Sequence, residues 1–291
     1  MAVLLDGDAL AATWRDEIKR DAARLTQAGI TPGLATILVG GDEASAHYVS
    51  RKHQDCAETG ILSRDIRLPE TVRQDELLGH VRELNAEPTL HGVLVQLPLP
   101  AHIDAASIQL AVAPEKDVDG LHPLNLGALV LGQRRLRPCT PSAILGLLQA
   151  YRVPLAGRRV AVIGRGLLVG RTLAIMLADP AIDAIPTLLH RGAPDLAAVT
   201  RESDAVIAAA GVPDLVRADM LKPGACAVGV GITYRNGEMI SDIADDVASV
   251  AGFLTPRHGS VGPLTRAMLL RNVIEAAGAY SAATRGAGPT A

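Results

Sequence analysis

The chain has 291 residues and a formal net charge of −3, and 48% of its residues are hydrophobic although only 2% are aromatic. This length suits one large or two ordinary domains, and the small charge gives no electrostatic reason to expect a nucleic acid or a membrane surface as partner. Cys56, Cys139 and Cys226 show no metal or disulfide spacing, and neither a signal peptide nor an apolar run of about 18 residues is present. We therefore expect a soluble cytoplasmic protein without a metal site.

The first part of the chain alternates between helical and extended patterns. Asp8 is the expected cap of a first helix, which ends at Gly29. A buried strand is predicted at 34–39, further strands at 61–68 and 92–97, and helices at 43–59, 75–85 and about 103–112. Gly60 follows the second helix as its stop signal. Strands that alternate with helices indicate a parallel sheet with right-handed crossovers.

A second unit repeats this alternation. Thr140 is the expected cap of a helix with Pro141 at its first position. A strand begins at Val160, later strands are predicted at 187–189, 205–209, 225–230 and 252–254, and a last helix runs from Pro263 to about Tyr280. The fold class is therefore α/β.

The stretch 158–177, RRVAVIGRGLLVGRTLAIML, joins a β-branched strand to a helix through Gly164, Gly166 and Gly170. Glycines let a backbone approach an anion closely, and a helix N-terminus directs unpaired N–H groups toward it. The spacing G-x-G-x-x-x-G is one residue longer than the usual dinucleotide fingerprint. The stretch predicts a dinucleotide site, and a tight turn without a ligand is the alternative.

The residue at the end of the next strand determines whether NAD or NADP is preferred. A carboxylate there would bind a ribose hydroxyl, whereas an arginine suits a 2′-phosphate. His190-Arg191-Gly192 follows the strand at 187–189, and no carboxylate stands there. Arg191, together with Arg165, favours NADP over NAD. The alternative for Arg191 is a solvated surface side chain.

Five polar residues of the first part could carry chemistry. Tyr48 and Lys52 stand four apart and share one helix face, and Gln96 ends an apolar strand. Lys52 could be an acid or base if its surroundings lower its pKa, or simply a surface lysine. Asp117 and Asp119 lie in the loop K-D-V-D-G-L-H, which lacks the later ligands of a calcium loop, so either carboxylate could bind a nitrogen-rich ring or cap a turn.

Six segments together resemble the bifunctional methylenetetrahydrofolate dehydrogenase/cyclohydrolase family over nearly the whole chain. They are Y-V-S-R-K (48–52), V-Q-L-P-L-P (95–100), K-D-V-D-G-L-H-P (116–123), R-P-C-T-P (137–141), V-I-G-R-G-L-L-V-G-R (162–171) and V-G-P-L-T (261–265). The resemblance implies two α/β domains with an active-site cleft between them. These are a folate-binding domain at 1–139, completed by a helix at about 264–282, and a Rossmann-like NADP-binding domain at 140–263. We expect a disordered tail at 283–291.

The resemblance also implies an activity, partners and residue roles. Such enzymes oxidise 5,10-methylenetetrahydrofolate with NADP and hydrolyse the methenyl product to 10-formyltetrahydrofolate, in one-carbon metabolism, usually as homodimers. By position, Lys52 resembles the catalytic lysine, Gln96 the amide that holds it, Asp119 the carboxylate that binds the pterin, and Tyr48 the ring that packs on the folate. Further contacts are implied for the substrate at Val95, Leu97, Gly262 and Pro263, and for the cofactor at Gly164, Arg165, Gly166, Gly170, Arg191 and Ile232.

Four stretches depart from the family pattern, all on the cofactor side or in the turn that meets it. Thr172 replaces a usual proline, Gly166 an often-found serine, Gly229 the aspartate of D-V-G-I, and His258-Gly259-Ser260 the P-G-G of P-G-G-V-G-P. The bifunctional enzyme is the leading hypothesis. A divergent paralogue with cyclohydrolase activity but altered cofactor use, and a non-catalytic folate or dinucleotide sensor, are the alternatives. A shikimate-type dehydrogenase would share the fold but not these motifs.

Overall fold

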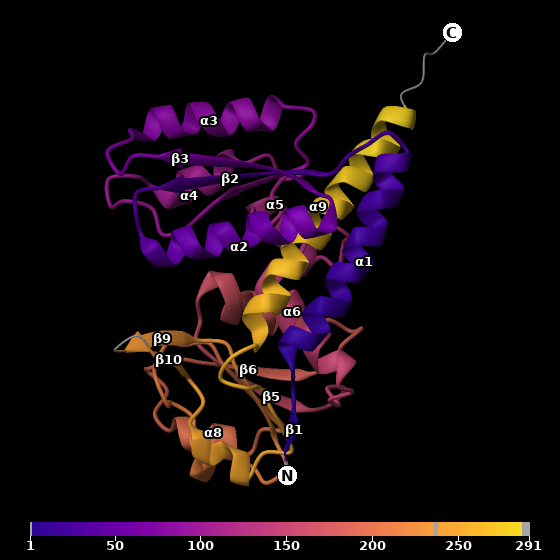
Figure 1. Cartoon of the computed structure of the whole chain (residues 1–291). Helices are drawn as coiled ribbons and strands as arrows, with labels where there is room; N and C mark the ends of the chain where they lie inside the picture. The colour runs from indigo at the N-terminus through magenta and orange to yellow at the C-terminus, as the bar shows by residue number, and fades with distance from the viewer. Residues whose placement is uncertain (1, 236–237, 287–291) are drawn as a thin grey trace. The chain divides into compact units, whose positions relative to one another are not determined.

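The computed structural model describes residues 2–235 and 238–286, and the chain divides into two units (Figure 1). Unit 1 comprises Met1–Ala12 and Thr140–Thr265, and unit 2 comprises Thr13–Cys139 and Arg266–Ala291. Each unit contains a parallel β-sheet with helices, which confirms the predicted α/β class. Among the described helices, none combines the length and apolar character that a membrane crossing requires.

The sheet of unit 2 has three parallel strands in the order β3-β2-β4. Figure 1 shows α2 and α3 on opposite sides of this sheet. The strands are β2 (Gly33–Val39), β3 (Leu62–Leu68) and β4 (Gly92–Val95). The helices are α1 (Gly7–Gln27, in unit 2 from Thr13), α2 (Glu43–Thr59), α3 (Gln74–Ala86), α4 (Ala105–Ala111), α5 (Pro123–Val130) and α9 (Val261–Gly286, in unit 2 from Arg266).

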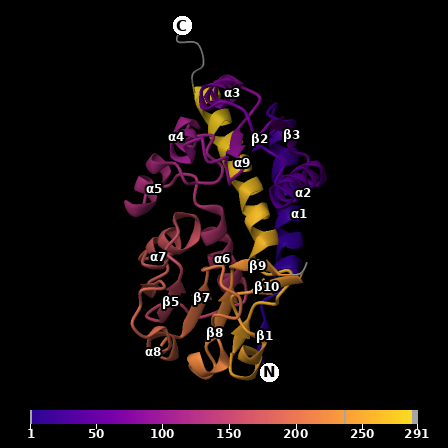
Figure 2. The same cartoon turned by 90° about the vertical axis from the view of Figure 1, so that its left-hand side faces the viewer.

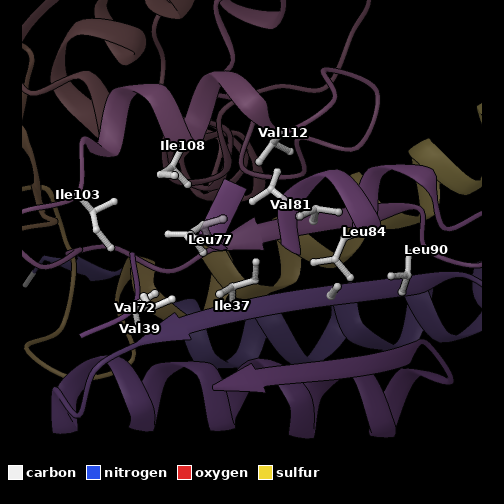
Figure 3. Packing of buried hydrophobic residues seen from close by; sticks show 13 residues of the cluster. Ile37, Val39, Val72, Leu77, Val81, Leu84, Leu90, Ile103, Ile108 and Val112 are labelled. Carbon is white, nitrogen blue, oxygen red and sulfur yellow. The ribbon is translucent and has the colours of Figure 1, made fainter. Parts of the chain in front are cut away.

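Alternation along the strands divides the core of unit 2 between two sheet faces. Ile37 and Val39 point toward Leu77 of α3 and Ile108 of α4, as Figure 3 shows. The opposite face is turned to α2, since the Thr36 hydroxyl lies 2.7 Å from His53 Nε2. Side chains at even-numbered positions of β2 therefore face α2. The candidate site described below lies on this face of the sheet.

The helix ends show which sequence signals act. Asp42 caps α2, because its side chain accepts a 2.8 Å hydrogen bond from the Ser45 N–H, and Gly60 ends the helix with φ of 77°. At α1 the predicted cap is wrong: Asp6, not Asp8, accepts from the Ala9 N–H at 2.9 Å. The pattern of apolar residues places a helix reliably but leaves its first turn uncertain by one or two residues.

The sheet of unit 1 has six parallel strands in the order β1-β11-β8-β7-β5-β6. Figure 2 shows β5, β7 and β8 side by side. The strands are β1 (Val3–Leu4), β5 (Arg159–Ile163), β6 (Ile185–Leu189), β7 (Ala205–Ala208), β8 (Cys226–Gly229) and β11 (Phe253–Leu254). The helices are α6 (Cys139–Ala150), α7 (Thr172–Leu177) and α8 (Leu196–Arg201), and a separate hairpin joins β9 (Ile232–Arg235) to β10 (Glu238–Ser241).

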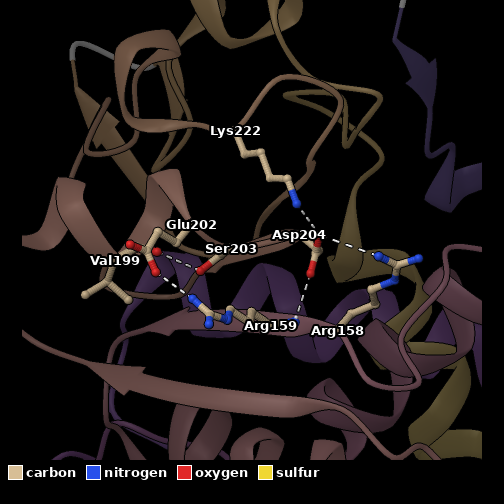
Figure 4. Close-up of polar contacts among 7 residues, drawn as sticks. All are labelled: Arg158, Arg159, Val199, Glu202, Ser203, Asp204 and Lys222. Atoms are coloured by element: carbon tan, nitrogen blue, oxygen red, sulfur yellow. Dashed lines mark hydrogen bonds and ion pairs between the residues drawn. The ribbon is translucent and has the colours of Figure 1, made fainter.

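The chain leaves β5 toward β6 on one side and returns to β7 on the other, so the strand order reverses at β5. Ligands of open α/β sheets bind at such a reversal, outside the carboxyl ends of the strands. The amino ends carry a different group of side chains (Figure 4). There Asp204 accepts hydrogen bonds from the Arg159 N–H at 3.0 Å and from Lys222 Nζ at 2.7 Å.

Several boundaries differ from the sequence-based expectations. Residues 1–12 group with unit 1, because β1 pairs with β11 through Val3–Phe253 and Leu4–Leu254. Two residues are too few to show a strand period, and their partner lies far along the chain. Helix α6 begins at Cys139, one residue before the predicted cap, and α9 continues to Gly286. Of the tail predicted to be disordered, 287–291 lie outside the described residues.

Candidate functional site

The first part of the site lies on one face of α2 in unit 2. Tyr48 and Lys52 are one helical turn apart, and Lys52 Nζ lies 4.5 Å from the centroid of the Tyr48 ring. Lys52 is only 6% exposed, and its Nζ donates a 2.9 Å hydrogen bond to Gln96 Oε1. The alternative of a surface lysine is therefore wrong. Burial disfavours the charged form of an amine, so a lysine in this position can exchange a proton more readily than a surface lysine.

Gln96 reaches Lys52 because the strand alternation continues past the end of β4. The Gln96 N–H still donates to the Ile37 carbonyl at 2.9 Å, which keeps the residue in the sheet register. An even-numbered position there faces α2. The side-chain Nε2 donates to the Leu97 carbonyl at 2.7 Å, so the amide oxygen is directed at Lys52. Gln96 is thus a fixed acceptor for the lysine.

Asp119 lies in a loop whose conformation is fixed by hydrogen bonds from neighbouring residues. Asp117 forms a bridge with Val93 and accepts hydrogen bonds from the His122 N–H at 2.7 Å and from Asn125 Nδ2 at 2.8 Å. Asn272 of α9 donates to the Val118 carbonyl at 2.7 Å. Of the two aspartates, Asp117 therefore organises the loop. Asp119 is the one whose charge acts on Lys52.

The electrostatics of these groups work in opposite directions. Burial lowers the pKa of Lys52, although the Asp119 carboxylate opposes that shift. Burial likewise raises the pKa of Asp119, against the attraction of Lys52. Burial also raises the pKa of the Tyr48 phenol and of the Cys139 thiol, so both stay protonated near neutral pH. The amine of Lys52, whose pKa is lowered, thus interacts with the carboxyl group of Asp119, whose pKa is raised.

Four further residues surround this site and were not predicted from the sequence. Asp55 lies on the same face of α2 and accepts a 2.6 Å hydrogen bond from Arg266 Nε of α9. The Cys139 thiol donates to the Val118 carbonyl at 3.1 Å, and Asn272 holds the same carbonyl. A signal was available for Asp55, whose spacing from Lys52 places both on one helix face. Arg266 and Asn272 are distant in sequence and gave none.

The remaining substrate-binding candidates lie in both units. Val95 is buried in β4, and Leu97, two residues later, is 37% exposed. Gly262 and Pro263 lie in the first turn of α9, in the part that belongs to unit 1. The structure thus brings Tyr48, Lys52, Gln96 and Asp119 together within unit 2, and roles for the other four stay predictions.

A cavity of about 720 Å³ lies in unit 1 at the carboxyl ends of β5, β6 and β7. This is where the strand order reverses, and such crevices hold dinucleotides in open α/β sheets. The described residues that line it are Ile163, Gly164, Arg165, Gly166, His190, Arg191, Ala193, Leu196, Ala209, Ala210, Val212 and Leu215. None of them is a carboxylate, whereas two are arginines.

The three glycines of the turn have different structural roles. Gly164 has φ of +111°, and a Cβ there would lie 2.3 Å from the Ala209 carbonyl oxygen. A Cβ on Gly170 would lie 1.7 Å from the Gly164 carbonyl oxygen. Around Gly166, no described atom beyond its two chain neighbours lies within 4 Å of the Cβ position. Gly164 and Gly170 are therefore needed for the turn itself, whereas Gly166 leaves open space beside the cavity.

The extra residue in the glycine spacing is absorbed by a π-helical turn. Residues Leu167–Arg171 form it, and the Arg171 N–H donates to the Gly166 carbonyl five residues earlier at 3.0 Å. A π-turn holds one residue more than an α-turn, and such turns occur frequently at functional sites. The unusual spacing is thus compatible with the strand–turn–helix geometry of a phosphate site.

The two arginines project from neighbouring strand ends. Arg165 follows β5 and Arg191 follows β6, and both are exposed at the cavity. Arg165 Nη1 lies 3.4 Å from His190 Nε2. This lining fits NADP: the glycine turn leaves backbone room for the diphosphate, and the arginines supply charge for a 2′-phosphate. The predicted contact Ile232 begins β9, but its side chain lies outside the described part of the structure.

Family models match both the part of the chain that holds Lys52 and the part that holds the cavity. The catalytic-domain model of the tetrahydrofolate dehydrogenase/cyclohydrolase family matches residues 5–119, and the NAD(P)-binding-domain model of the same family matches residues 138–281. The chain belongs to the tetrahydrofolate dehydrogenase/cyclohydrolase family. Membership confirms the family that the six sequence segments indicated.

Solved structures support this family assignment. The bifunctional methylenetetrahydrofolate dehydrogenase/cyclohydrolase of Campylobacter jejuni is 41% identical, with 96% of this chain and 99% of that chain covered and a TM-score of 0.93. The Trypanosoma brucei enzyme, solved with NADP and an inhibitor, is 37% identical, with coverages of 98% and 99% and a TM-score of 0.91. Shikimate 5-dehydrogenase of Thermus thermophilus, with 17% identity, 85% and 99% coverage and a TM-score of 0.50, shares the fold alone.

Two of the departures from the family pattern are in direct contact. Ser260 Oγ donates a 2.9 Å hydrogen bond to the Gly229 carbonyl, and the Gly229 N–H donates to Thr255 Oγ1 at 2.8 Å. A Cβ on Gly229 would lie 2.3 Å from Ser241 Oγ, so the space beside Gly229 is already filled. Where the family usually has an aspartate, this chain thus has Gly229, and Ser241 and Ser260 contact it.

The other departures are accommodated locally. The Thr172 side chain is buried, and its hydroxyl donates to the carbonyls of Val169 at 2.9 Å and Leu167 at 3.1 Å within the π-turn. His258 is exposed, and Gly166 borders open space. The cofactor-binding unit of this family member thus keeps its fold and its cavity. Among the described residues, no group of His, Cys, Asp or Glu side chains could hold a metal ion.

Proposed function

We propose that unit 2 binds the folate and carries the acid–base group, and that unit 1 binds NADP. As a member of its family, the chain is an NADP-dependent methylenetetrahydrofolate dehydrogenase and methenyltetrahydrofolate cyclohydrolase. The observation that supports the division of roles is the buried Lys52 amine, hydrogen-bonded to Gln96 beside the Tyr48 ring. A non-catalytic sensor would not need this costly burial of an amine.

For the oxidation, the residues position the reactants. The Tyr48 ring packs on the folate, and Asp119 accepts hydrogen bonds from the donors of the pterin. The glycine turn and Arg191 hold the dinucleotide in unit 1. NADP, when bound, supplies the hydride acceptor. A hydride transfer depends on orientation more than on an acid or base, which is why rigid binding groups suffice for this step.

For the hydrolysis, Lys52 moves protons. The neutral amine accepts a proton from the water that attacks the methenyl carbon. The resulting ammonium then gives this proton to the ring nitrogen as the bond between that nitrogen and the carbon breaks. The hydroxyl on the carbon releases its own proton to solvent as the C=O bond forms, which leaves the 10-formyl product. Burial lowers the pKa of Lys52 and makes the neutral form available, and Gln96 holds the amine in place in either protonation state.

Two absorbance assays test this proposal. The purified chain is given 5,10-methylenetetrahydrofolate with NADP or NAD, and reduced nicotinamide is followed; loss of methenyltetrahydrofolate is followed separately. We expect both activities, with NADP preferred. Cyclohydrolase activity without reduction of either nucleotide would favour the divergent paralogue, and absence of both activities would contradict the proposal.

Replacing Asp119 by alanine is expected to weaken folate binding much more than NADP binding. The carboxylate is the proposed partner of the pterin donors, and a hydrogen bond to a charged group contributes about 1.5–3 kcal/mol. Titration with each ligand measures both affinities. An equal loss for both ligands would instead assign Asp119 a structural role in its loop.

Replacing Arg191 by alanine is expected to raise the Michaelis constant for NADP about tenfold or more and to leave that for NAD nearly unchanged. A 2′-phosphate would lose a charge-assisted hydrogen bond of about 1.5–3 kcal/mol, whereas the ribose hydroxyl of NAD gains little from this side chain. Steady-state kinetics with the two nucleotides measure the difference. A parent enzyme that used NAD better than NADP would contradict the role of Arg191.

We further propose that the enzyme is a cytoplasmic homodimer that supplies one-carbon units, for example for purine synthesis. The three cysteines are free and buried, which suits a reducing compartment. The dimer is proposed from the family resemblance. Light scattering of the purified chain measures its mass in solution, and a monomer at assay concentrations would contradict this assignment.

A further inference from the structure

A buried ion pair lies beside the catalytic face of α2, and the proposed mechanism does not use it. Arg266 Nε of α9 donates to Asp55 Oδ2 of α2 at 2.6 Å, and the side chains are 15% and 9% exposed. Asp55 is three residues beyond Lys52, on the same buried face. The ion pair therefore lies within unit 2, about one helical turn from the lysine.

Anchoring the helices alone does not require these two charges. Removing two charges from water is expensive, and apolar side chains of similar size often stabilise a protein as much or more. Helix α9 is also held at another point in unit 2, where Arg271 donates a hydrogen bond to Glu17 of α1. Figures 1 and 2 show these two helices side by side. A role for the charge itself is the better explanation of Asp55 and Arg266.

We propose that Asp55 and Arg266 are positioning residues for Lys52: the ion pair fixes the Arg266 guanidinium beside the Tyr48–Lys52 face, where its positive charge favours the neutral amine. This inference rests on the proposed role of Lys52 as an acid–base group. Arginine suits the task because its guanidinium stays charged at every pH of interest, so the field at the lysine is constant.

The charges around Lys52 support this direction. Burial lowers the pKa of Lys52 most, Asp119 and Cys139 raise it, Arg266 lowers it, and Cys56 raises it slightly. Arg266 also lowers the pKa of Tyr48, so its charge acts on both residues of this face. The titratable or charged groups that face Lys52 are Tyr48, His53, Asp55 and Cys56 of α2, Asp119 of the loop after β4, Cys139 of α6 and Arg266 of α9. Arg266 is the permanent cation among them and counteracts Asp119.

The test is a titration of Lys52 by NMR, because the chain has only four lysines (Lys19, Lys52, Lys116 and Lys222). Protein labelled with ¹³C at lysine Cε gives resolved signals, and a Lys52→Arg variant assigns the one of interest. We expect Arg266→Gln to raise the pKa of Lys52 by about one unit and Arg266→Lys to restore it. The acid limb of the cyclohydrolase pH profile should move upward with it, with about tenfold less activity at limiting low pH.

A second variant keeps the test decisive if Arg266→Gln does not fold, since that change leaves Asp55 buried and unpaired. The double variant Asp55→Asn/Arg266→Gln has no charge at these two positions, and its two amides can still form a hydrogen bond. It should fold and also show a raised pKa of Lys52. The matched control is Asp75→Asn/Arg73→Gln, which removes the exposed 2.8 Å pair at the start of α3 and should leave Lys52 unchanged.

The possible outcomes separate this inference from the proposed function. An unchanged pKa of Lys52 in both folded Arg266 variants would overturn the inference and leave the pair as a helix anchor. The NMR titration requires no turnover. A parent chain without cyclohydrolase activity would therefore contradict the function of Lys52 while the titration still reported whether Arg266 sets its protonation.

Discussion

Cyclohydrolase activity is expected to fall about 10²–10⁴-fold when Lys52 is replaced by methionine, because the reaction would lose its positioned acid–base group. Methionine has a similar length and fills the same space, so the Tyr48 ring keeps a neighbour. The variant should unfold at or above the parent temperature, since a buried amine is replaced by an apolar group. Hydrolysis of methenyltetrahydrofolate and a thermal melt measure the two effects.

Lys19 provides the matched control for this experiment. It is an exposed lysine of α1 in the same chain, and Lys19→Met should leave both the rate and the melt unchanged. A Lys52→Met enzyme with the parent rate would show that another group moves the protons. A large fall in melting temperature would show instead that the amine is needed for folding.

Replacing Gly170 by alanine is expected to remove most NADP binding. The new Cβ would lie 1.7 Å from the Gly164 carbonyl oxygen, a backbone atom, so the turn must open. Forcing one extra carbon into a packed site typically costs about 1–3 kcal/mol, and here the strain falls on the backbone that faces the cavity. We expect at least a tenfold weaker NADP affinity by fluorescence titration, together with a lower melting temperature.

Gly166 tests whether this effect is specific. It belongs to the same glycine motif, but no described atom beyond its two chain neighbours lies within 4 Å of its Cβ position. Gly166→Ala should therefore retain the parent melting temperature and most of its NADP affinity. Equal losses in the two variants would mean that every glycine of the motif is needed for conformational freedom, against the steric explanation given for Gly170.

The elements that were predictable from sequence are those with long regular patterns. Helix α2 was predicted at its observed bounds, with Gly60 as its stop signal; that Asp42 caps its start was seen only in the structure. The strand of the glycine motif was found because β-branched residues precede Gly164. The pair β9–β10 and the two-residue β1 were missed, because short strands have no period of their own and their partners are set by tertiary packing.

The site was predictable to the extent that its residues lie within motifs. Tyr48 and Lys52 share a helix, so their common face follows from spacing alone. That Gln96 reaches Lys52 depends on the pairing of β4 with β2, which no local pattern reveals. The contribution of Arg266 could not be predicted, because 211 residues separate it from Asp55. Burial, which shifts the pKa of Lys52, is likewise a property of the folded unit.

The division of the chain into units has a consequence for its synthesis on the ribosome. Unit 1 needs β1 from the first residues and β11, which emerges only after most of the chain has been made. Unit 2 needs α9, which leaves the exit tunnel after all strands of that unit and whose Asn272 and Arg266 hold the loop of Asp119 and helix α2. A nascent chain truncated at residue 139 therefore contains the three strands of the unit 2 sheet but lacks α9, and of the unit 1 sheet it contains only β1. Both units finish folding late in translation. A ribosome stalled before α9 is expected to carry a chain that proteases still cleave readily.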